Sequence, residues 1–191
     1  PRSLSGLSLW LDAADSSTFT YSSGSNISSW ADKSGNGRNA IPNTGTGIYS
    51  ATALNSTLPG VQITAAGNMR ATVAAGTFSS GVSAFVLYQK TGANQTFDAL
   101  IARTGPTNTS WAGPFDLYSI SGTNTRRLTG SGGPNNNVYS EVAGVAATRS
   151  TTPTVYHFNV LSSAPTIWNE TINGTFTSYT LNIATGTPTY S

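Results

Sequence analysis

Hydrophobic and polar residues alternate along several short stretches of this chain, and this alternation predicts β-strands. Leucine occupies every second position of residues 7–11, and Tyr156, Phe158 and Val160 lie on one side of a later stretch. Residues 84–88 form a nearly unbroken apolar run, which predicts a strand buried on both faces. No stretch shows a convincing helical periodicity.

Further strand candidates are separated by turn signals. They occupy residues 28–30, 60–63, 115–120, 167–172 and 175–183. Asn173-Gly174 lies between the last two, and this dipeptide predicts a hairpin because both residues tolerate positive φ. About ten short strands joined by polar turns predict an all-β fold, an antiparallel two-sheet β-sandwich.

The composition agrees with this fold class. Ser and Thr make up 55 of the 191 residues, and this excess disfavours helices. A chain of this length can bury one sizeable core. We therefore expect a single domain over residues 1–191, and we expect it to be a segment of a longer chain.

Charge and cysteine content exclude several classes of protein. A net charge of +2 is too small to mark a nucleic-acid-binding surface. The chain has no Cys, which excludes a disulfide framework, a thiolate metal site and a Cys nucleophile. No apolar run approaches the length of about 18 residues that a membrane span needs, so we expect none.

Two segments near the start of the chain carry a resemblance to a known family. They are residues 9–13, LWLDA, and residues 30–40, WADKSGNGRNA. They resemble the laminin G-like, concanavalin A-like jelly-roll domains of phage, large DNA virus and bacterial surface proteins. Residues 60–64 and 83–88 and the Asn173-Gly174 hairpin are similar to later strands and a hairpin of that family.

The resemblance implies a concanavalin A-like jelly roll and an outward-facing, non-catalytic module. Such a module is a capsid decoration, a fibre, or an attachment or adhesion domain, located on a virion surface or extracellularly. Its partners would be other virion or surface subunits, and glycans. The alternatives are a carbohydrate-binding module of a secreted enzyme and a degenerate glycoside hydrolase. The chain departs from the family at residues 63–67, which replace a common Phe-Asp-Gly, and in ending at Ser191 before a last strand.

Catalytic groups are sparse. A retaining glycosidase needs two carboxylates about 5 Å apart. Glu141 and Glu170 are the only glutamates and are far apart in the sequence, and Asp12 and Asp15 would face opposite sides of a strand. The single histidine, His157, has no accompanying Gly-x-Ser-x-Gly elbow, so we expect it to be structural. These observations predict that the protein is not an enzyme.

One loop offers the oxygen atoms that calcium prefers. The candidate ligands are Asp12, Asp32 and Asn36. The alternative is a structural role, in which Asp32 and Asn36 bond the backbone in Asx turns while Gly35 and Gly37 take positive φ. The loop lacks the closing bidentate Glu of an EF-hand, so we favour the turns; calcium is the only cofactor that the sequence brings into question.

Trp111 is the candidate for ligand contact, with Asn108 beside it. Trp111 lies in a polar segment bracketed by prolines, where an exposed ring could stack on a sugar. The alternative is that its ring closes the edge of the sandwich. The other tryptophans, Trp10, Trp30 and Trp168, are expected in the core.

Six Asn-x-Ser/Thr sequons offer glycosylation sites. They are at Asn26, Asn55, Asn94, Asn108, Asn169 and Asn173. A chain this rich in Ser and Thr would contain several by chance, so the number is weak support for an extracellular glycoprotein.

Overall fold

The structure, a computed structural model, consists of β-strands. It describes residues 3–64, 67–72, 81–89, 91, 98–102, 116–119, 126–129, 139–142, 152–161 and 166–181. The only helix among them is one 3-10 turn, Ser16–Thr18, and the part of the chain described holds no helix able to cross a bilayer. Every strand pairing is antiparallel, so the predicted all-β antiparallel fold is confirmed.

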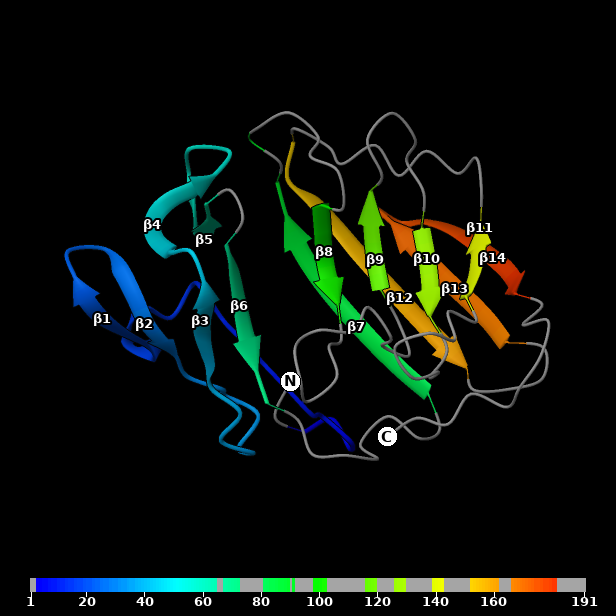
Figure 1. Ribbon diagram of the computed structural model, residues 1–191, viewed down its shortest axis with the longest axis horizontal. Helices are drawn as coiled ribbons and strands as arrows, with labels where there is room; N and C mark the ends of the chain where they lie inside the picture. The colour runs from blue at the N-terminus through cyan, green and yellow to red at the C-terminus, as the bar shows by residue number, and fades with distance from the viewer. Residues whose placement is uncertain are drawn as a thin grey trace. The chain divides into compact units, whose positions relative to one another are not determined.

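The chain divides into two compact units, Pro1–Thr77 and Phe78–Ser191, and the single domain stays a prediction. The first unit contains one six-stranded sheet in the order β5-β4-β2-β3-β6, with β1 paired to β2 (Figure 1). Its strands are β1 (Phe19–Ser23), β2 (Asn26–Trp30), β3 (Ala40–Thr44), β4 (Gly47–Leu54), β5 (Leu58–Ile63) and β6 (Asn68–Ala71).

An aromatic cluster packs at the centre of this sheet. The ring of Phe19, which is buried, lies 5.2 Å from the ring of Trp30 and 4.8 Å from that of Tyr49. Trp10 and Trp30, both expected in the core, are half-buried, and the ring of Trp30 packs against buried Phe19. The indole N–H of Trp30 has no hydrogen-bond acceptor among the described residues.

The second unit contains two four-stranded sheets, β11-β10-β9-β8 and β14-β13-β12-β7 (Figure 1). Strand β11 lies against β14, so the two sheets meet at one edge. The strands are β7 (Gly81–Tyr88), β8 (Asp98–Ala102), β9 (Asp116–Ser119), β10 (Arg126–Thr129), β11 (Tyr139–Val142), β12 (Thr154–Leu161), β13 (Thr166–Ile172) and β14 (Thr175–Leu181).

The sheet β14-β13-β12-β7 has one face that is buried at its centre, on β12 and at Glu170 of β13, and an opposite face with no buried residue among those described. Strand β12 follows the predicted alternation. Tyr156 and Phe158 are buried, and Val155, which points to the other face, is about half exposed. The β13–β14 connection is the predicted Asn173-Gly174 hairpin, whose φ angles are 46° and 87°. Strand order and register therefore place every second residue of all four strands on the exposed face.

Strand β7 corrects one sequence prediction. Its apolar run over residues 84–88 predicted burial on both faces, but Phe85 is 73 % exposed and Leu87 about half exposed. The run contains no polar residue to mark its outer side, because apolar side chains occupy both sides of the strand. Apolar continuity is therefore no evidence here for burial on two faces.

The opening segment corrects a second prediction. Residues 7–11 have the period of a strand, but they form no strand pairing. Their backbone is bonded mainly by side chains: Asp32 Oδ1 accepts from Trp10 N at 3.0 Å, and Asn36 Nδ2 donates to the carbonyl of Leu7 at 2.9 Å. Two backbone hydrogen bonds add to these, from Lys33 N to Trp10 O at 2.8 Å and from Leu7 N to Leu4 O at 3.3 Å. Hydrogen bonds to the side chains of Asp32 and Asn36 thus take the place of the strand pairing that the alternating pattern predicted.

Candidate functional site

The exposed face of the sheet β14-β13-β12-β7 is the strongest candidate for a binding surface, and we call it the open face. Ten described residues form it: Ser83, Phe85, Leu87, Val155, His157, Asn159, Asn169, Thr171, Phe176 and Ser178.

One line of residues crosses all four strands of the open face, and we call it the aromatic row. It is composed of Phe85, His157, Thr171 and Phe176, each directly opposite the next in the strand register. Phe85 is 73 % exposed and Phe176 is 65 % exposed. With strands about 4.8 Å apart, the two phenyl rings project from positions about 14 Å apart.

The ring of Phe85 is held in place by its neighbour. His157 stacks on it with the ring centroids 4.0 Å apart and the planes 11° from parallel. Ser83 Oγ lies 2.9 Å from His157 Nε2 in a hydrogen bond that fixes the imidazole from the other side. Phe85 therefore presents a pre-organised aromatic surface at little cost in side-chain entropy.

A polar row runs parallel to the aromatic row, at a distance of two residues on each strand. It consists of Ser83, Asn159, Asn169 and Ser178, again in direct register. Two residues of a strand span about 6.8 Å, which is the separation of the two rows. Ser178 Oγ donates to Asn169 Oδ1 at 2.6 Å, and this hydrogen bond orients the amide of Asn169.

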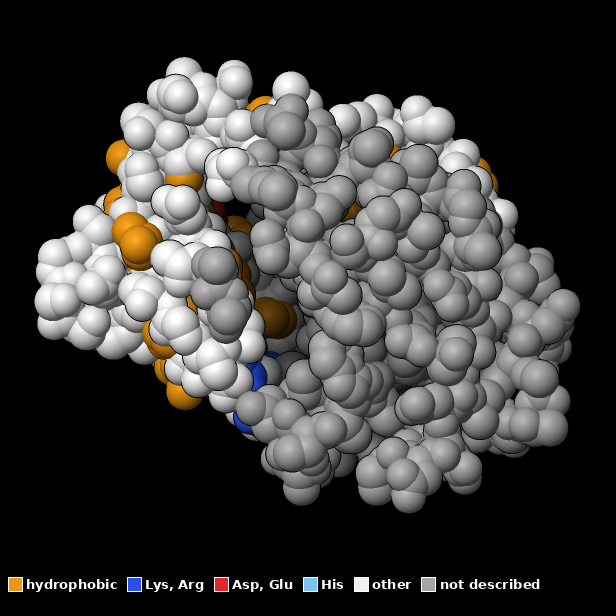
Figure 2. Space-filling model, turned by 45° about the horizontal axis from the view of Figure 1, so that its top comes forward, with side chains coloured by type: hydrophobic (Ala, Val, Ile, Leu, Met, Phe, Trp, Pro, Cys, Tyr) orange, Lys and Arg blue, Asp and Glu red, His pale blue; other side chains and the backbone are white. Residues whose placement is uncertain are grey.

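The open face carries no Asp, Glu, Lys or Arg. Its chemistry is aromatic and aliphatic surface beside neutral amides and hydroxyls, with His157 as the single titratable group. In the one view drawn in Figure 2, few of the described side chains are charged (blue or red). Such a face suits a neutral ligand with both apolar surface and hydroxyl groups.

The Ser83–His157 pair has the distance of a nucleophile and its base, but the rest of a hydrolase site is missing among the described residues. A serine nucleophile needs an acid that orients the imidazole and donors that stabilise an oxyanion. Glu170, the described carboxylate nearest in register, belongs to the opposite face. The backbone groups that β7 and β12 direct toward each other are engaged in the ladder between the two strands. The described contacts of the pair are the hydrogen bond between its two members and the stacking of His157 on Phe85.

Glu170 itself is a buried carboxyl in the core of the second unit. It is 2 % exposed, and Tyr156 Oη donates to its Oε2 at 2.8 Å. A polymeric substrate cannot reach it. The side chain of Glu141 falls outside the described residues, so the structure does not describe the Glu141–Glu170 pair. Asp12 and Asp15, which we expected on opposite sides of a strand, lie at the two ends of a turn instead, and both carboxylates bond the ammonium group of Lys33.

A second cluster lies in the first unit, around Lys33. Its ammonium group bridges Asp12 Oδ2 at 2.8 Å and Asp15 Oδ2 at 2.9 Å, and it lies 4.6 Å from the centre of the Trp10 ring. Because a cation already occupies the space between the two carboxylates, this cluster is a structural tie between the opening segment and the loop that follows β2.

Asp32 is the hub of the adjacent loop. Its carboxylate accepts from the backbone N–H groups of Trp10, Ser34 and Arg38 at 2.8–3.0 Å and from Ser34 Oγ at 2.7 Å. Burial raises the pKa of Asp32, but these donors outweigh burial, so the net pKa lies below its usual value. Gly35 adopts a φ of 93°, as predicted for a tight turn.

The hydrogen bonds of Asp12, Asp32 and Asn36 can be compared with what a calcium site would need. Asn36 Nδ2 faces the carbonyls of Leu7 and Ser8, and the oxygens of Asp12 and Asp32 have protein donors. Among the described residues no group of three or more His, Asp or Glu is placed to hold a metal. Calcium binding by Asp12, Asp32 and Asn36 stays a prediction, and the contacts favour the alternative in which these residues organise turns.

Replacing Asp32 with alanine tests its role as the hub. The variant leaves three backbone N–H groups without their acceptor, so we expect a loss of about 3 kcal/mol in the free energy of unfolding, measured by urea denaturation. Asn43→Ala, at an exposed polar position of the same unit, is the matched control and should change stability by less than about 0.5 kcal/mol. Equal stabilities for the two variants would contradict the assignment.

The Lys33 cluster predicts a loss of stability in acid. Hydrogen bonds from Ser17 and Lys33 lower the pKa of Asp15 from 3.8 to about 2. The folded state therefore binds this proton more weakly than the unfolded chain, and the stabilisation is complete above pH 3.8 and is lost as the pH falls toward 2. The melting temperature of the Asp15→Asn variant should vary less between these pH values than that of the parent protein. An identical pH dependence would show that Asp15 is not responsible.

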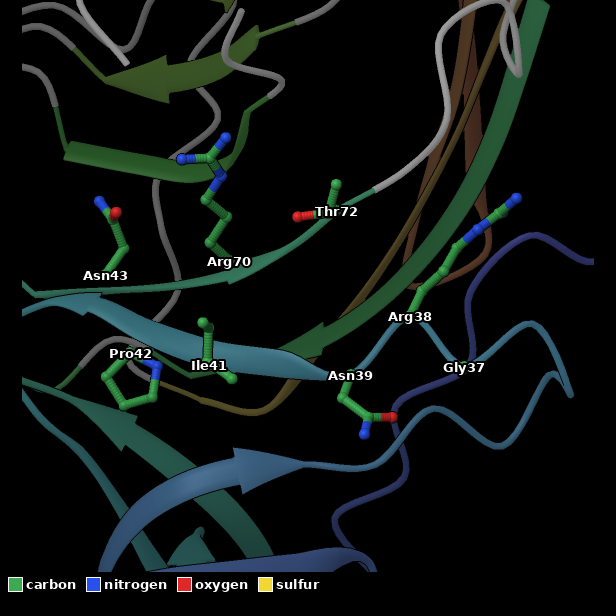
Figure 3. Close-up of a pocket in the computed structure, with 8 residues that line it drawn as sticks. All are labelled: Gly37, Arg38, Asn39, Ile41, Pro42, Asn43, Arg70 and Thr72. Atoms are coloured by element: carbon green, nitrogen blue, oxygen red, sulfur yellow. The ribbon is translucent and has the colours of Figure 1, made fainter. Parts of the chain in front are cut away.

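The first unit also has a pocket of about 480 Å³ (Figure 3). Its walls are formed by Gly37, Arg38, Asn39, Ile41, Pro42, Asn43, Arg70 and Thr72. The guanidinium groups of Arg38 and Arg70 point in different directions, and Arg38 Nη1 donates to Ser8 O at 2.8 Å. The two cations do not converge on one anion, so the pocket is not a phosphate or carboxylate site of the usual kind.

Several of the residues predicted to contact a ligand or carry a glycan are not described by the structure. Trp111, Asn108 and Asn94 lie outside the described residues, and so does the side chain of Trp168. Asn55 adopts a φ of 49° in an exposed turn.

The other sequons are in strands or at their ends. Asn26 is half-buried in β2, and Asn173 Oδ1 accepts from Val155 N at 2.9 Å at the β13–β14 hairpin. Asn169 belongs to the polar row, so a glycan there would cover the open face. Glycosylation at all six positions stays a prediction.

Comparison of the chain with protein families, with curated proteins and with solved structures finds no match. The resemblance to laminin G-like domains therefore stays a prediction.

The residues of the open face were not identified from the sequence. Phe85 and Phe176 are separated in sequence by most of the second unit, and three strand pairings, β7 with β12, β12 with β13 and β13 with β14, bring them into one row. The one available signal was the Asn173-Gly174 hairpin, which fixes the register of Phe176 opposite Thr171.

Proposed function

We propose that this protein is a non-catalytic, outward-facing adhesion module that binds neutral carbohydrate through the open face. The observation that carries the proposal is the side-by-side arrangement of the aromatic row and the polar row. Aromatic rings stack on the apolar faces of sugars, and neutral amides and hydroxyls bond sugar hydroxyls. The absence of formal charge from the ten residues of the open face favours a neutral over an anionic glycan.

The proposed setting is a virion or cell surface, and the proposed fold is a concanavalin A-like jelly roll. The antiparallel strands, the meeting of β11 with β14 and the buried inner positions of β12 support a two-sheet arrangement of the second unit. The low charge and absence of Cys are compatible with an exterior location.

A binding survey tests the proposal. The full chain is incubated with a glycan array and with insoluble neutral polysaccharides, with and without EDTA. We expect retention by one or more neutral polysaccharides, unchanged by EDTA because the open face needs no metal. Retention that requires calcium would move the site to the loop of Asp32, and absence of retention by every glycan would reject the proposal.

A structural role is the second candidate, because the open face also carries an apolar corner. Phe85, Leu87 and Val155 are neighbours on β7 and β12, and each is at least about half exposed. A contiguous exposed apolar patch is a usual feature of subunit interfaces. Hydroxyl-radical footprinting of the assembly that contains this protein, without any glycan, decides between the candidates. Protection of Phe85 from oxidation favours subunit packing. Oxidation of Phe85 favours glycan binding.

A further inference from the structure

The shape of the open face determines what kind of carbohydrate it can hold, if the proposed function is correct. A site for a terminal sugar is a pocket that surrounds one ring. The open face has instead two exposed phenyl groups at its opposite edges, Phe85 on β7 and Phe176 on β14. They are about 14 Å apart by strand spacing, which is more than the width of one sugar ring.

The surface between these edges is continuous. His157 and Thr171 fill the aromatic row between the two phenyl groups, and both are half-buried, whereas the two phenyl groups are exposed. The polar row lies parallel at about 6.8 Å along its whole length. A ligand along the aromatic row would therefore have a line of neutral hydroxyl and amide groups along one side.

We infer that the open face binds a linear, neutral polysaccharide that crosses the strands from Phe85 to Phe176, with its hydroxyl edge toward Asn159 and Asn169. The two rings act as separate stacking positions for different sugar units of one chain. The ligand is thus the interior of a polymer, not its end, and binding needs several consecutive units.

The twist of the sheet narrows the ligand further. Neighbouring strands are rotated by about 20°, so the rings on β7 and β14 differ in direction by roughly 60°. A chain that stacks on both must twist by a similar amount. Single chains in solution or in amorphous material can twist, whereas chains packed in a flat crystalline surface cannot. We therefore expect a preference for the soluble or amorphous form.

A chain-length series tests the inference on the full protein. Cello-oligosaccharides and chito-oligosaccharides, from the monosaccharide to the hexasaccharide, are titrated by calorimetry. We expect no measurable binding of either monosaccharide and a rise in affinity of about thirtyfold once the ligand reaches the second ring. In the Phe176→Ala variant this rise should disappear, while the affinity for short oligosaccharides stays unchanged.

The outcomes separate this inference from the proposed function. A monosaccharide that binds as tightly as the hexasaccharide would contradict the inference and leave carbohydrate binding in place. Stronger retention by crystalline than by amorphous cellulose would contradict the twisted path. If no neutral glycan of any length or form binds, the proposed function itself is wrong. Ile41→Ala, at an exposed apolar position of the first unit, is the control and should leave every affinity unchanged.

Discussion

The Phe158→Ala variant is expected to unfold at a much lower urea concentration than the Phe85→Ala variant. Both residues are phenylalanines in paired strands, and they occupy opposite faces of the same sheet. Phe158 is 0 % exposed, so its truncation leaves a cavity and should cost about 3–5 kcal/mol. Phe85 is 73 % exposed, and its truncation removes only the stacking on His157, for which we expect a loss below about 1 kcal/mol.

Chemical denaturation of the two variants side by side provides the measurement. The comparison is informative because the substitution is identical and only the face of the sheet differs. Similar losses in both variants would mean that Phe85 is buried in solution, and the open face would then not exist.

Removal of both exposed rings should nearly abolish glycan binding. Truncation of a central aromatic contact typically costs about 2 kcal/mol in binding, or about thirtyfold in affinity. Phe85 and Phe176 are about 14 Å apart by strand spacing, far enough for the two losses to add. The Phe85→Ala/Phe176→Ala variant should therefore bind its polysaccharide about a thousandfold more weakly, as measured by depletion or calorimetry.

Two controls accompany this variant. Ile41→Ala/Leu58→Ala removes two exposed apolar side chains from the first unit and should leave the affinity unchanged. The thermal unfolding of the double-phenylalanine variant should match that of the parent protein. Unchanged affinity in a folded Phe85→Ala/Phe176→Ala variant would show that the glycan binds elsewhere.

The sequence was most informative where a local signal determines the backbone. Asn173-Gly174 identified a hairpin, and the alternation of Tyr156 and Phe158 identified the buried face of β12. Gly35 and Gly37 identified a turn of positive φ. Each of these signals acts over a few residues, so no tertiary information was needed to interpret it.

The sequence was least informative where distant segments decide the outcome. The opening segment has the period of a strand, but the side chains of Asp32 and Asn36 take its backbone groups. The same applies to the open face, since Phe85 and Phe176 become neighbours of one row only through three strand pairings. Hydrophobic patterning identifies which residues can be apolar in a strand, but it cannot say which sheet face remains uncovered.

The difference between motif and site follows from the same physics. Asp12, Asp32 and Lys33 make the opening motif distinctive because they tie a loop to an extended segment, and their donors and acceptors are used for that purpose. A binding surface needs groups with remaining capacity for a ligand. The exposed rings and amides of the open face have that capacity and form no recognisable sequence motif.

Two-dimensional NMR of the isotope-labelled protein, titrated with cellohexaose or chitohexaose, tests the central claim most directly. The account predicts that shift changes concentrate at outward positions of the four strands, including Phe85, Asn159 and Phe176, and spare the loop around Asp32. Changes that concentrate at the Asp32 loop, or at the inward positions of β12, would contradict it.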